Sequence, residues 1–295
     1  MVRPGAAVER VPAPALFVGS GMAQYLGAAI AVGLFATIPA EGVAWLRILV
    51  AAALLVAWRR PWRIGWSRRD LALAAAFGLA LGVMNVAFYV AIEHLPLGTA
   101  VAIEFVGPVA VAAVVGGWRE RSGIGLAALG VVLLAGVTVS SDVPGAAIGL
   151  AAIGVAAAAW AAYIVLGRRV AVRGDGVTRL SVAMAVAAVV GAPFLAARSA
   201  PVLDAWYLVA AVVGIAVLSS VLPYAVEQVV LRRVGPAAFA VLLALLPATA
   251  AVVGAVALRQ WPSALELVGL LLVSAAIALT APRRRAVTPT TAGAA

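Results

Sequence analysis

The sequence contains no cysteine, no lysine and a single histidine among its 295 residues. The absence of cysteine excludes disulfide bonds, thiolate nucleophiles and thiolate metal sites. One histidine cannot build a multi-histidine metal site, and we expect neither a metal nor another cofactor. Charge is also scarce, because 11% of the residues are charged while 65% are hydrophobic. In soluble proteins roughly a quarter of all residues are charged. A lipid bilayer is therefore the solvent that suits this composition.

Hydrophobic runs of helical length fill most of the chain. A spanning helix needs about 20 apolar residues, and none of the runs shows the two-residue alternation of a membrane strand. The sequence therefore predicts an all-α polytopic membrane protein with ten transmembrane helices. Their expected ranges are 14–36, 41–58, 71–94, 96–117, 123–140, 146–167, 180–197, 206–229, 236–258 and 264–281.

Arginine divides the segments between these runs into two kinds. Most arginines lie in the N-terminal tail, in every second connector and in the C-terminal tail, whereas the remaining connectors carry only Arg198 and Arg259. Cytoplasmic connectors retain arginine, so we expect a multi-pass protein of the bacterial inner membrane with both termini in the cytoplasm. The net charge of +10 has this origin, and we expect no nucleic acid as a partner.

Two similar stretches suggest an internal repeat. His94-Leu-Pro-Leu-Gly through Pro108 and Arg233-Val-Gly-Pro through Pro247 each combine a turn before a helix with a proline near the middle of that helix. Chance similarity in an alanine- and leucine-rich background is the alternative. Two five-helix repeats enter the membrane in inverted orientation, as in transporters that bind substrate between their halves. The expected divisions are an N-tail at 1–13, repeats at 14–140 and 146–281, and a disordered cytoplasmic C-tail at 282–295.

Polar residues inside the hydrophobic runs are the candidate site. Arg47, Asn85 and Glu104 fall about 9–14 Å below the outer ends of their helices at the helical rise. Tyr89 lies one turn outward of Asn85 on the same face. Arg47 and Glu104 can hold the carboxylate and ammonium of an amino acid, with Glu104 the first choice for carrying a proton; a structural salt bridge is the alternative. Gln24, near mid-membrane, is expected to face a cavity or to make an interhelical hydrogen bond.

The second half adds a group of candidates nearer the cytoplasm. Ser220, Tyr224 and Glu227 share one face of their helix. Glu227 is the second choice for proton coupling, and the alternative is an interfacial glutamate that reaches water. Trp160 and Tyr163 share a helix face, where they serve either as a substrate platform or as ordinary packing. We therefore expect substrate-binding residues in both halves.

Several of these stretches resemble the EamA-type drug/metabolite transporters, and within them the threonine/homoserine exporter branch. The resemblance implies ten helices, two EamA repeats and efflux of small amino acids or related metabolites. It strengthens the candidates that lie inside matched motifs, and the chain departs from the family at Leu246 and Gln260, where glutamates are frequent. The matching stretches are Gln24-Tyr-Leu-Gly-Ala-Ala-Ile-Ala, Leu46-Arg47, Gly82-Val-Met-Asn-Val-Ala-Phe-Tyr89, Pro96-Leu-Gly-Thr-Ala-Val-Ala-Ile-Glu-Phe-Val-Gly-Pro108, Trp160-Ala-Ala-Tyr-Ile-Val-Leu-Gly-Arg-Arg and Ser219-Ser-Val-Leu-Pro-Tyr-Ala-Val-Glu-Gln-Val-Val-Leu-Arg-Arg.

We therefore expect a secondary exporter of small, threonine- or homoserine-like amino acids, coupled to protons. The alternative is an exporter of the same fold for a cationic drug, a sugar or a lipid-linked precursor. A membrane enzyme needs a cluster of water-facing acids, histidines or serines, which no connector carries, and a structural subunit does not need polar residues at mid-depth. No nucleotide-binding loop is present, so direct ATP drive is not expected. The expected partners are the lipid bilayer, a small-molecule substrate and the proton.

Overall fold

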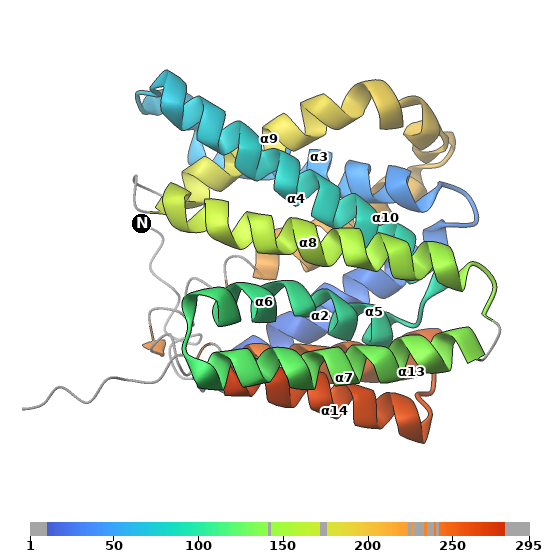
Figure 1. Ribbon diagram of the computed structural model, residues 1–295. Helices are drawn as coiled ribbons and strands as arrows, with labels where there is room; N and C mark the ends of the chain where they lie inside the picture. The colour runs from blue at the N-terminus through green and yellow to red at the C-terminus, as the bar shows by residue number, and fades with distance from the viewer. Residues whose placement is uncertain are drawn as a thin grey trace, which may run out of the picture.

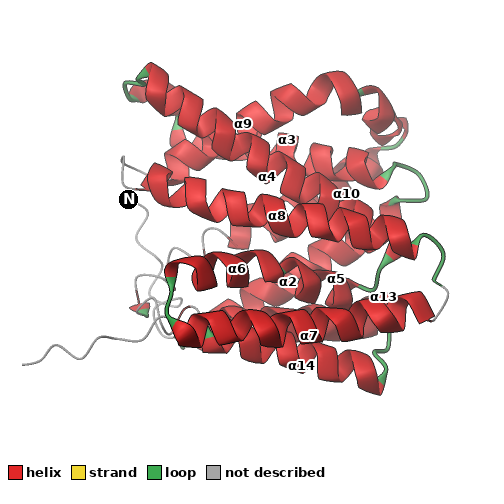
Figure 2. Cartoon of the chain, viewed as in Figure 1, coloured by secondary structure: helices red, strands yellow, loops and turns green. Residues whose placement is uncertain are grey.

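The computed structural model describes residues 11–140, 143–171, 176–223, 226, 230, 233–234, 239 and 242–280. Within these ranges the chain is built of helices and connectors without strands, which confirms the all-α prediction (Figure 2). The elements are α2 (Ala13–Leu34), α3 (Ala40–Arg59), the 3₁₀ turn η1 (Pro61–Arg63), α4 (Arg68–His94), α5 (Leu97–Glu104), α6 (Val106–Val115), α7 (Trp118–Ser140), α8 (Ala146–Ala171), α9 (Gly176–Leu195), the 3₁₀ segment η2 (Ala197–Asp204), α10 (Trp206–Ala216), the π-helical segment η3 (Val217–Val221), α13 (Leu246–Leu258) and α14 (Ala264–Leu279).

Many of these helices have the length and composition of membrane spans. In the described part of the chain seven helical stretches qualify, namely α2, α3 with η1, α4, α5 with α6, α7, α8 and α9. The pair formed by η2 and α10–η3 is bent by 116°, and α13 and α14 are shorter apolar helices. The protein is therefore a multi-pass membrane protein. The number ten stays a prediction, because parts of 206–229 and 236–258 lie outside the described residues.

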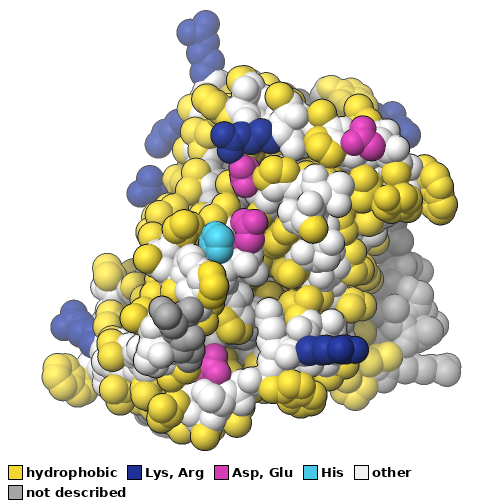
Figure 3. All heavy atoms as spheres, turned by 90° about the vertical axis from the view of Figure 1, so that its right-hand side faces the viewer, with side chains coloured by type: hydrophobic (Ala, Val, Ile, Leu, Met, Phe, Trp, Pro, Cys, Tyr) yellow, Lys and Arg dark blue, Asp and Glu magenta, His cyan; other side chains and the backbone are white. Residues whose placement is uncertain are grey.

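The connectors alternate between the two ends of the helical bundle (Figure 1). The α3–α4, α6–α7 and α8–α9 connectors lie at one end, and the α2–α3, α4–α5, α7–α8, α9–α10 and α13–α14 connectors lie at the other. The described arginine-rich connectors therefore share one end, as a regular zigzag requires. Figure 3 looks onto the opposite end, where acidic side chains, the single histidine and scattered arginines stand among hydrophobic and uncharged atoms.

Two helices begin at a capping box. The hydroxyl of Ser67 accepts a hydrogen bond from the Asp70 N–H at 3.1 Å, and the Asp70 carboxylate accepts from the Ser67 N–H at 3.4 Å. Ser263 and Glu266 make the same reciprocal pair at the start of α14, at 3.3 and 2.8 Å. These bonds satisfy amides that have no partner within the helix. They explain why α4 begins a few residues before the expected hydrophobic run at 71.

The fourth hydrophobic run is broken at Phe105, between α5 and α6. Pro108 has no N–H to donate to the carbonyl group of Glu104, four residues earlier, and its ring crowds that carbonyl. The helix is therefore interrupted beside Glu104. This position matters because a helix break places both a polar side chain and free backbone groups in the interior of the bundle.

Small residues bring helices close together at the crossing of α4 and α9, which pack extensively on each other. A Cβ atom at Gly78 would overlap the backbone carbonyl of Ala183, and one at Gly82 would lie 3.2 Å from the Cβ of Ala187. Gly78 and Gly82 are four residues apart, as are Ala183 and Ala187, so the two contacts repeat one turn along both helices. The crossing therefore depends on glycine at position 78 in particular.

Polar contacts fasten α9 to its neighbours at two levels. Within the bundle, the indole N–H of Trp45 donates to the carbonyl oxygen of Ala188 at 2.8 Å. At the arginine-rich end, Arg179 forms an ion pair with Asp70 at 3.0 Å, and its guanidinium lies 5.2 Å from the ring centroid of Trp66. Both sites join segments from the two expected halves of the chain.

Candidate functional site

A cavity of about 300 Å³ lies in the interior of the bundle. Its walls come from α2, α3, α4, α5, α6, α8, α9, η3 and α13, so both expected halves of the chain contribute. The sequence predicted most of the polar groups that face it. The predicted residues that line this central cavity are Gln24, Arg47, Asn85, Glu104, Trp160 and Tyr163.

Arg47 is the basic side chain of the central cavity. It projects from α3, is only 8% exposed, and its Nε atom is buried without a hydrogen-bond partner among the described residues. The structure shows no ion pair between Arg47 and Glu104, so the alternative of a structural salt bridge is not realised in this conformation. A buried guanidinium with unused donors is suited to a carboxylate.

Tyr89 packs against the guanidinium group of Arg47 without lining the cavity itself. The guanidinium carbon of Arg47 lies 4.8 Å from the ring centroid of Tyr89, which is completely buried and does not line the cavity. The ring of Phe35 packs against Tyr89 with 6.1 Å between centroids. The hydroxyl of Tyr89 is buried and makes no hydrogen bond with the part of the chain that the structure describes. The structure therefore places Tyr89 one layer farther from the cavity than a direct substrate contact requires.

Glu104 supplies the acidic group of the central cavity. It ends α5 at the helix break, and its side chain reaches the cavity, where it makes no hydrogen bond or ion pair with a described residue. An unpaired carboxyl group at this depth is unfavourable unless it meets water, a proton or a cationic ligand. Arg47 and Glu104 thus offer opposite charges to the same cavity without neutralising each other through direct contact.

Two amides lie in the wall near these charges. Asn85 donates a hydrogen bond from Nδ2 to the carbonyl oxygen of Leu81 at 2.8 Å, which leaves its amide oxygen available as an acceptor. The side chain of Gln24 lines the cavity, and its backbone carbonyl accepts a hydrogen bond from the Ser219 hydroxyl at 2.9 Å. The side-chain amide of Gln24 therefore takes the first of its two expected roles, at a cavity, and the interhelical hydrogen bond at this residue involves the main chain instead.

The predicted aromatic residues both line the cavity and pack against other rings. Trp160 meets Phe105 edge to face with 4.7 Å between ring centroids, and Tyr163 stacks on Phe77 at 4.5 Å. Phe105 is also the residue that separates α5 from α6. Trp160 therefore packs directly against the helix break while it lines the cavity. A substrate platform and ordinary packing, the two interpretations of Trp160 and Tyr163, are thus compatible.

The other two predicted site residues, Tyr224 and Glu227, lie outside the described residues. Ser219 was not among the predicted site residues, and Ser220 was predicted only to share a helix face with these two. The structure places both serines in the cavity wall, together with Met84 and Met184. The sequence signal for Ser219 and Ser220 is that two adjacent serines stand shortly before a proline in an apolar run. Nothing distinguishes Met84 and Met184 from ordinary core residues in the sequence.

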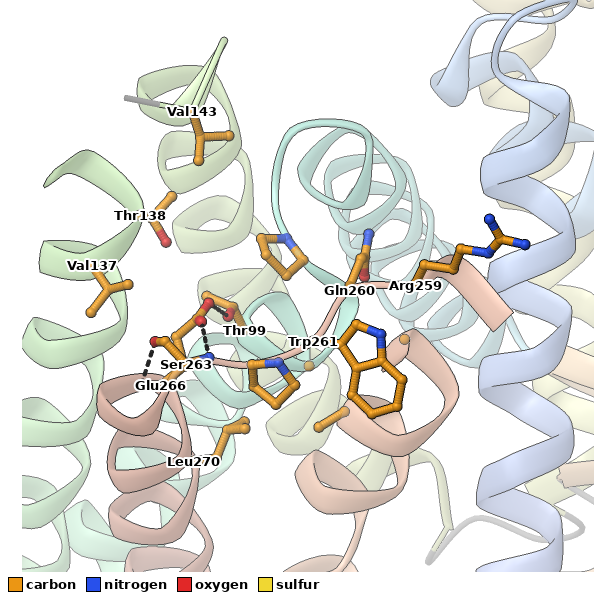
Figure 4. Close-up of a pocket in the computed structure, with 15 residues that line it drawn as sticks. Thr99, Val137, Thr138, Val143, Arg259, Gln260, Trp261, Ser263, Glu266 and Leu270 are labelled. Atoms are coloured by element: carbon orange, nitrogen blue, oxygen red, sulfur yellow. Dashed lines mark hydrogen bonds between the residues drawn. The ribbon is translucent and has the colours of Figure 1, made fainter. Parts of the chain in front are cut away.

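A second cavity, of about 370 Å³, opens at the end of the bundle opposite the arginine-rich connectors. Hydrogen bonds join Thr99, Ser263 and Glu266 in its wall (Figure 4). The Thr99 hydroxyl donates to Glu266 at 3.4 Å, Glu266 caps α14 through Ser263, and the side-chain oxygen of Gln260 accepts from the Leu97 N–H at 2.9 Å. At this outer cavity the connector between α13 and α14 is therefore fastened to α5. In the central cavity, by contrast, Arg47 and Glu104 form no ion pair with a described residue.

The arrangement in the central cavity suits binding and not covalent chemistry. Among the described residues no group of three acidic or histidine side chains is placed to hold a metal ion. The described part of the site offers one cationic group, one anionic group, the side chains of Gln24, Asn85 and Ser220, and an aromatic flank. These groups match a small zwitterion in a protein interior, where charge-assisted hydrogen bonds are strong.

Comparison with known proteins shows how the chain is related. The model of the EamA-like transporter family matches residues 147–281. The threonine/homoserine exporter RhtA of Salmonella typhimurium strain SL1344 is 35% identical over 258 residues, covering 85% of this chain and 84% of the relative. The exporter of the same name from Escherichia coli strain K12 is 33% identical over 252 residues, covering 83% and 82%.

A solved crystal structure of a protein covers 90% of this chain and 95% of its own, with a TM-score of 0.57 and 17% identity, which shows a likeness of fold alone. The comparison of function rests on the two exporters, because their similarity extends over most of this chain and most of each relative. They are named exporters, so the chain is a transporter and not an enzyme. This chain belongs to the EamA-like transporter family.

Proposed function

We propose that the protein exports small amino acids of the threonine and homoserine type across the bacterial inner membrane. The observation that carries the proposal is that Arg47 and Glu104 line one small cavity and make no ion pair with each other. Arg47 binds the α-carboxylate and Glu104 binds the α-ammonium group. The named activity of the relatives supports the same class of cargo.

The size and charge of the central cavity favour this cargo over the alternatives. Its volume of about 300 Å³ is at the lower limit for sites that hold drug-sized ligands, which occupy about 300–1,000 Å³. A lipid-linked precursor exceeds this space. A cationic drug would be repelled by Arg47, and an uncharged sugar would leave both Arg47 and Glu104 without a charged partner.

We infer the following architecture for this activity. Ten spans form two inverted repeats, at 14–140 and 146–281, with tails at 1–13 and 282–295 and both termini in the cytoplasm. The alternating connectors of Figure 1 support this arrangement, as does the family match, which begins close to the expected start of the second repeat. The arginine-rich end then faces the cytoplasm, in keeping with the charge bias of membrane proteins.

Export is coupled to protons in this proposal, with Glu104 as the residue that holds the proton and Glu227 as a second candidate in the other half. The support for Glu104 is its position at the helix break, where the carboxyl group faces the cavity without a protein partner. Protonation and binding of the substrate ammonium are mutually exclusive at one carboxylate. A proton entering from outside therefore displaces the amino acid, which couples the two flows.

The direct test is efflux from liposomes that contain the purified protein and are loaded with radiolabelled homoserine. We expect homoserine and threonine to leave faster than from protein-free liposomes. Arg47→Gln should slow this efflux about 10- to 100-fold, which is the value of a charge-assisted hydrogen bond. The matched control is Arg198→Gln, since Arg198 is 63% exposed and pairs with Glu41 away from the cavity.

Efflux no faster than from empty liposomes, across a panel of amino acids, would contradict the proposed cargo. Equal effects of the two arginine substitutions would contradict the role of Arg47 while leaving the cargo in place. The panel should include a cationic dye and a sugar, because preferential movement of either one would identify the alternative cargo directly.

A further inference from the structure

The helix that follows η2 changes its hydrogen-bonding pattern beside the central cavity. α10 is an ordinary α-helix up to Ala216, and residues Val217–Val221 then form a π-helical turn, η3. The N–H of Leu222 bonds to the carbonyl oxygen of Val217, five residues earlier. Such turns are rare and are frequent at functional sites, because the extra residue changes which side chains face inward.

Pro223 adds to the irregularity of this turn. Proline has no N–H, so residue 223 cannot donate to the carbonyl groups of Leu218 or Ser219 one turn earlier. Pro223, Ser219 and Ser220 all line the central cavity. The backbone is therefore irregular where it borders the cavity, which is where membrane proteins tolerate such irregularity.

The first serine of the turn is fixed by another helix. The hydroxyl of Ser219 donates to the carbonyl oxygen of Gln24 in α2 at 2.9 Å. A Cβ atom at Gly27 would overlap this hydroxyl, so α2 and η3 are in close contact. Ser219 therefore holds the π turn in place against α2.

The second serine has no such partner. Ser220 is 2% exposed and lines the central cavity, yet its hydroxyl makes no hydrogen bond with a described residue. Buried hydroxyls elsewhere in the described chain, such as those of Thr138, Ser181 and Thr280, donate to carbonyl groups of their own helices. The donor and the acceptor of Ser220 both remain available to a molecule in the cavity.

We infer that Ser220 forms a subsite for the side-chain hydroxyl group of the exported amino acid. This inference rests on the proposed function, in which Arg47 and Glu104 hold the carboxylate and the ammonium. Ser220 comes from the other expected half of the chain and supplies a third point of recognition in the same cavity. An amino acid without the hydroxyl leaves Ser220 buried and unpaired, which disfavours it.

Threonine and homoserine are both hydroxylated derivatives of 2-aminobutyrate, so these three amino acids isolate the contribution of one hydroxyl group. Concentration-dependent transport of each should be measured in proteoliposomes that contain the wild type, Ser220→Ala, Ser220→Thr or Ser20→Ala. Ser20 is also a buried serine with no hydrogen bond to a described residue, but it does not line the central cavity, which makes it the matched control.

We expect Ser220→Ala to raise the KM for threonine and homoserine about five- to tenfold relative to the KM for 2-aminobutyrate, the value of one neutral hydrogen bond. Ser220→Thr should restore the preference, and Ser20→Ala should keep it. An unchanged preference in a transporting Ser220→Ala variant overturns the inference. If the wild type moves none of the three amino acids, the proposed function fails instead.

A Ser220→Ala variant that transports nothing is assessed by ligand binding. The purified variant is heated with each amino acid, and the rise in its unfolding temperature is compared with that of the wild type. Selective loss of stabilisation by threonine and homoserine supports the subsite. An equal loss for 2-aminobutyrate overturns it, because the hydroxyl group would then play no part.

Discussion

The guanidinium carbon of Arg47 lies 4.8 Å from the ring centroid of Tyr89, and Arg47 lines the cavity without forming a hydrogen bond to any residue that the structure describes. Stacking on an aromatic face stabilises a cation without using its hydrogen-bond donors. The arrangement therefore keeps a positive charge in the bundle while its donors remain free for a ligand. Tyr89 is thus a positioning residue, and its role can be separated from that of Arg47.

The first prediction concerns the ring and the hydroxyl group of Tyr89. Tyr89→Phe keeps the ring under Arg47 and removes a buried hydroxyl that makes no hydrogen bond within the described chain. We expect it to retain homoserine transport and an unfolding temperature equal to or above that of the wild type. Tyr89→Leu removes the aromatic face and should raise the KM for homoserine. Similar transport by both variants would show that the ring does not position Arg47.

The second prediction tests the geometry of Arg47. Arg47→Lys keeps the positive charge but loses the planar fork that binds both oxygens of a carboxylate. We expect a KM for homoserine about tenfold higher, with partial transport preserved, in contrast to the stronger loss in Arg47→Gln. Concentration-dependent efflux of the two variants, measured in parallel, distinguishes a bidentate contact from a purely electrostatic one. Identical kinetics for Arg47→Lys and the wild type would exclude the bidentate contact.

The third prediction concerns proton coupling through Glu104. An acidic medium outside homoserine-loaded liposomes should accelerate efflux by the wild type. Glu104→Gln keeps an acceptor for the substrate ammonium group but cannot titrate, so we expect exchange of internal for external homoserine to continue at a higher KM and without acceleration by the pH gradient. Glu93→Gln is the matched control, because Glu93 is exposed and lies outside the cavity lining. Retained acceleration in Glu104→Gln would assign the coupling to another residue.

Much of this site could be predicted from the sequence, because depth in a membrane follows directly from position along a helix. Arg47 and Glu104 were placed at similar depth by counting residues, and they do line one cavity. The direction of a side chain depends on the neighbouring helices, which the sequence does not reveal. Tyr89 was therefore expected in contact with substrate, whereas the structure has it behind Arg47.

Helix breaks were only partly predictable. Each proline removes one hydrogen-bond donor, but the response depends on the surroundings. α9 continues through Pro193, the fourth run is interrupted three residues before Pro108, and a π turn precedes Pro223. The zigzag of helices, in contrast, follows from hydrophobic length and arginine placement, which depend on the bilayer and not on particular contacts.

The fourth prediction concerns the crossing of α4 and α9. Gly78→Ala places a methyl group against the backbone of Ala183, which cannot move without separating the two helices. We expect a loss of about 1–3 kcal/mol in stability, the usual range for overpacking, seen as a lower unfolding temperature in detergent. Gly136→Ala in α7 is the control, because a Cβ atom there meets no atom within 4 Å. Equal unfolding temperatures for both variants would contradict a tight crossing.

The fifth prediction concerns the helix break at Phe105. Pro108→Ala restores an N–H that can bond to the carbonyl group of Glu104, and alanine favours a continuous helix. We expect the variant to be more stable to heat than the wild type but slower in homoserine efflux, because a regular helix through Phe105 moves Glu104 relative to Arg47. Pro193→Ala is the control, since α9 is already continuous through Pro193. Faster efflux in Pro108→Ala, or an unchanged rate with raised stability, would show that the break is not needed for transport.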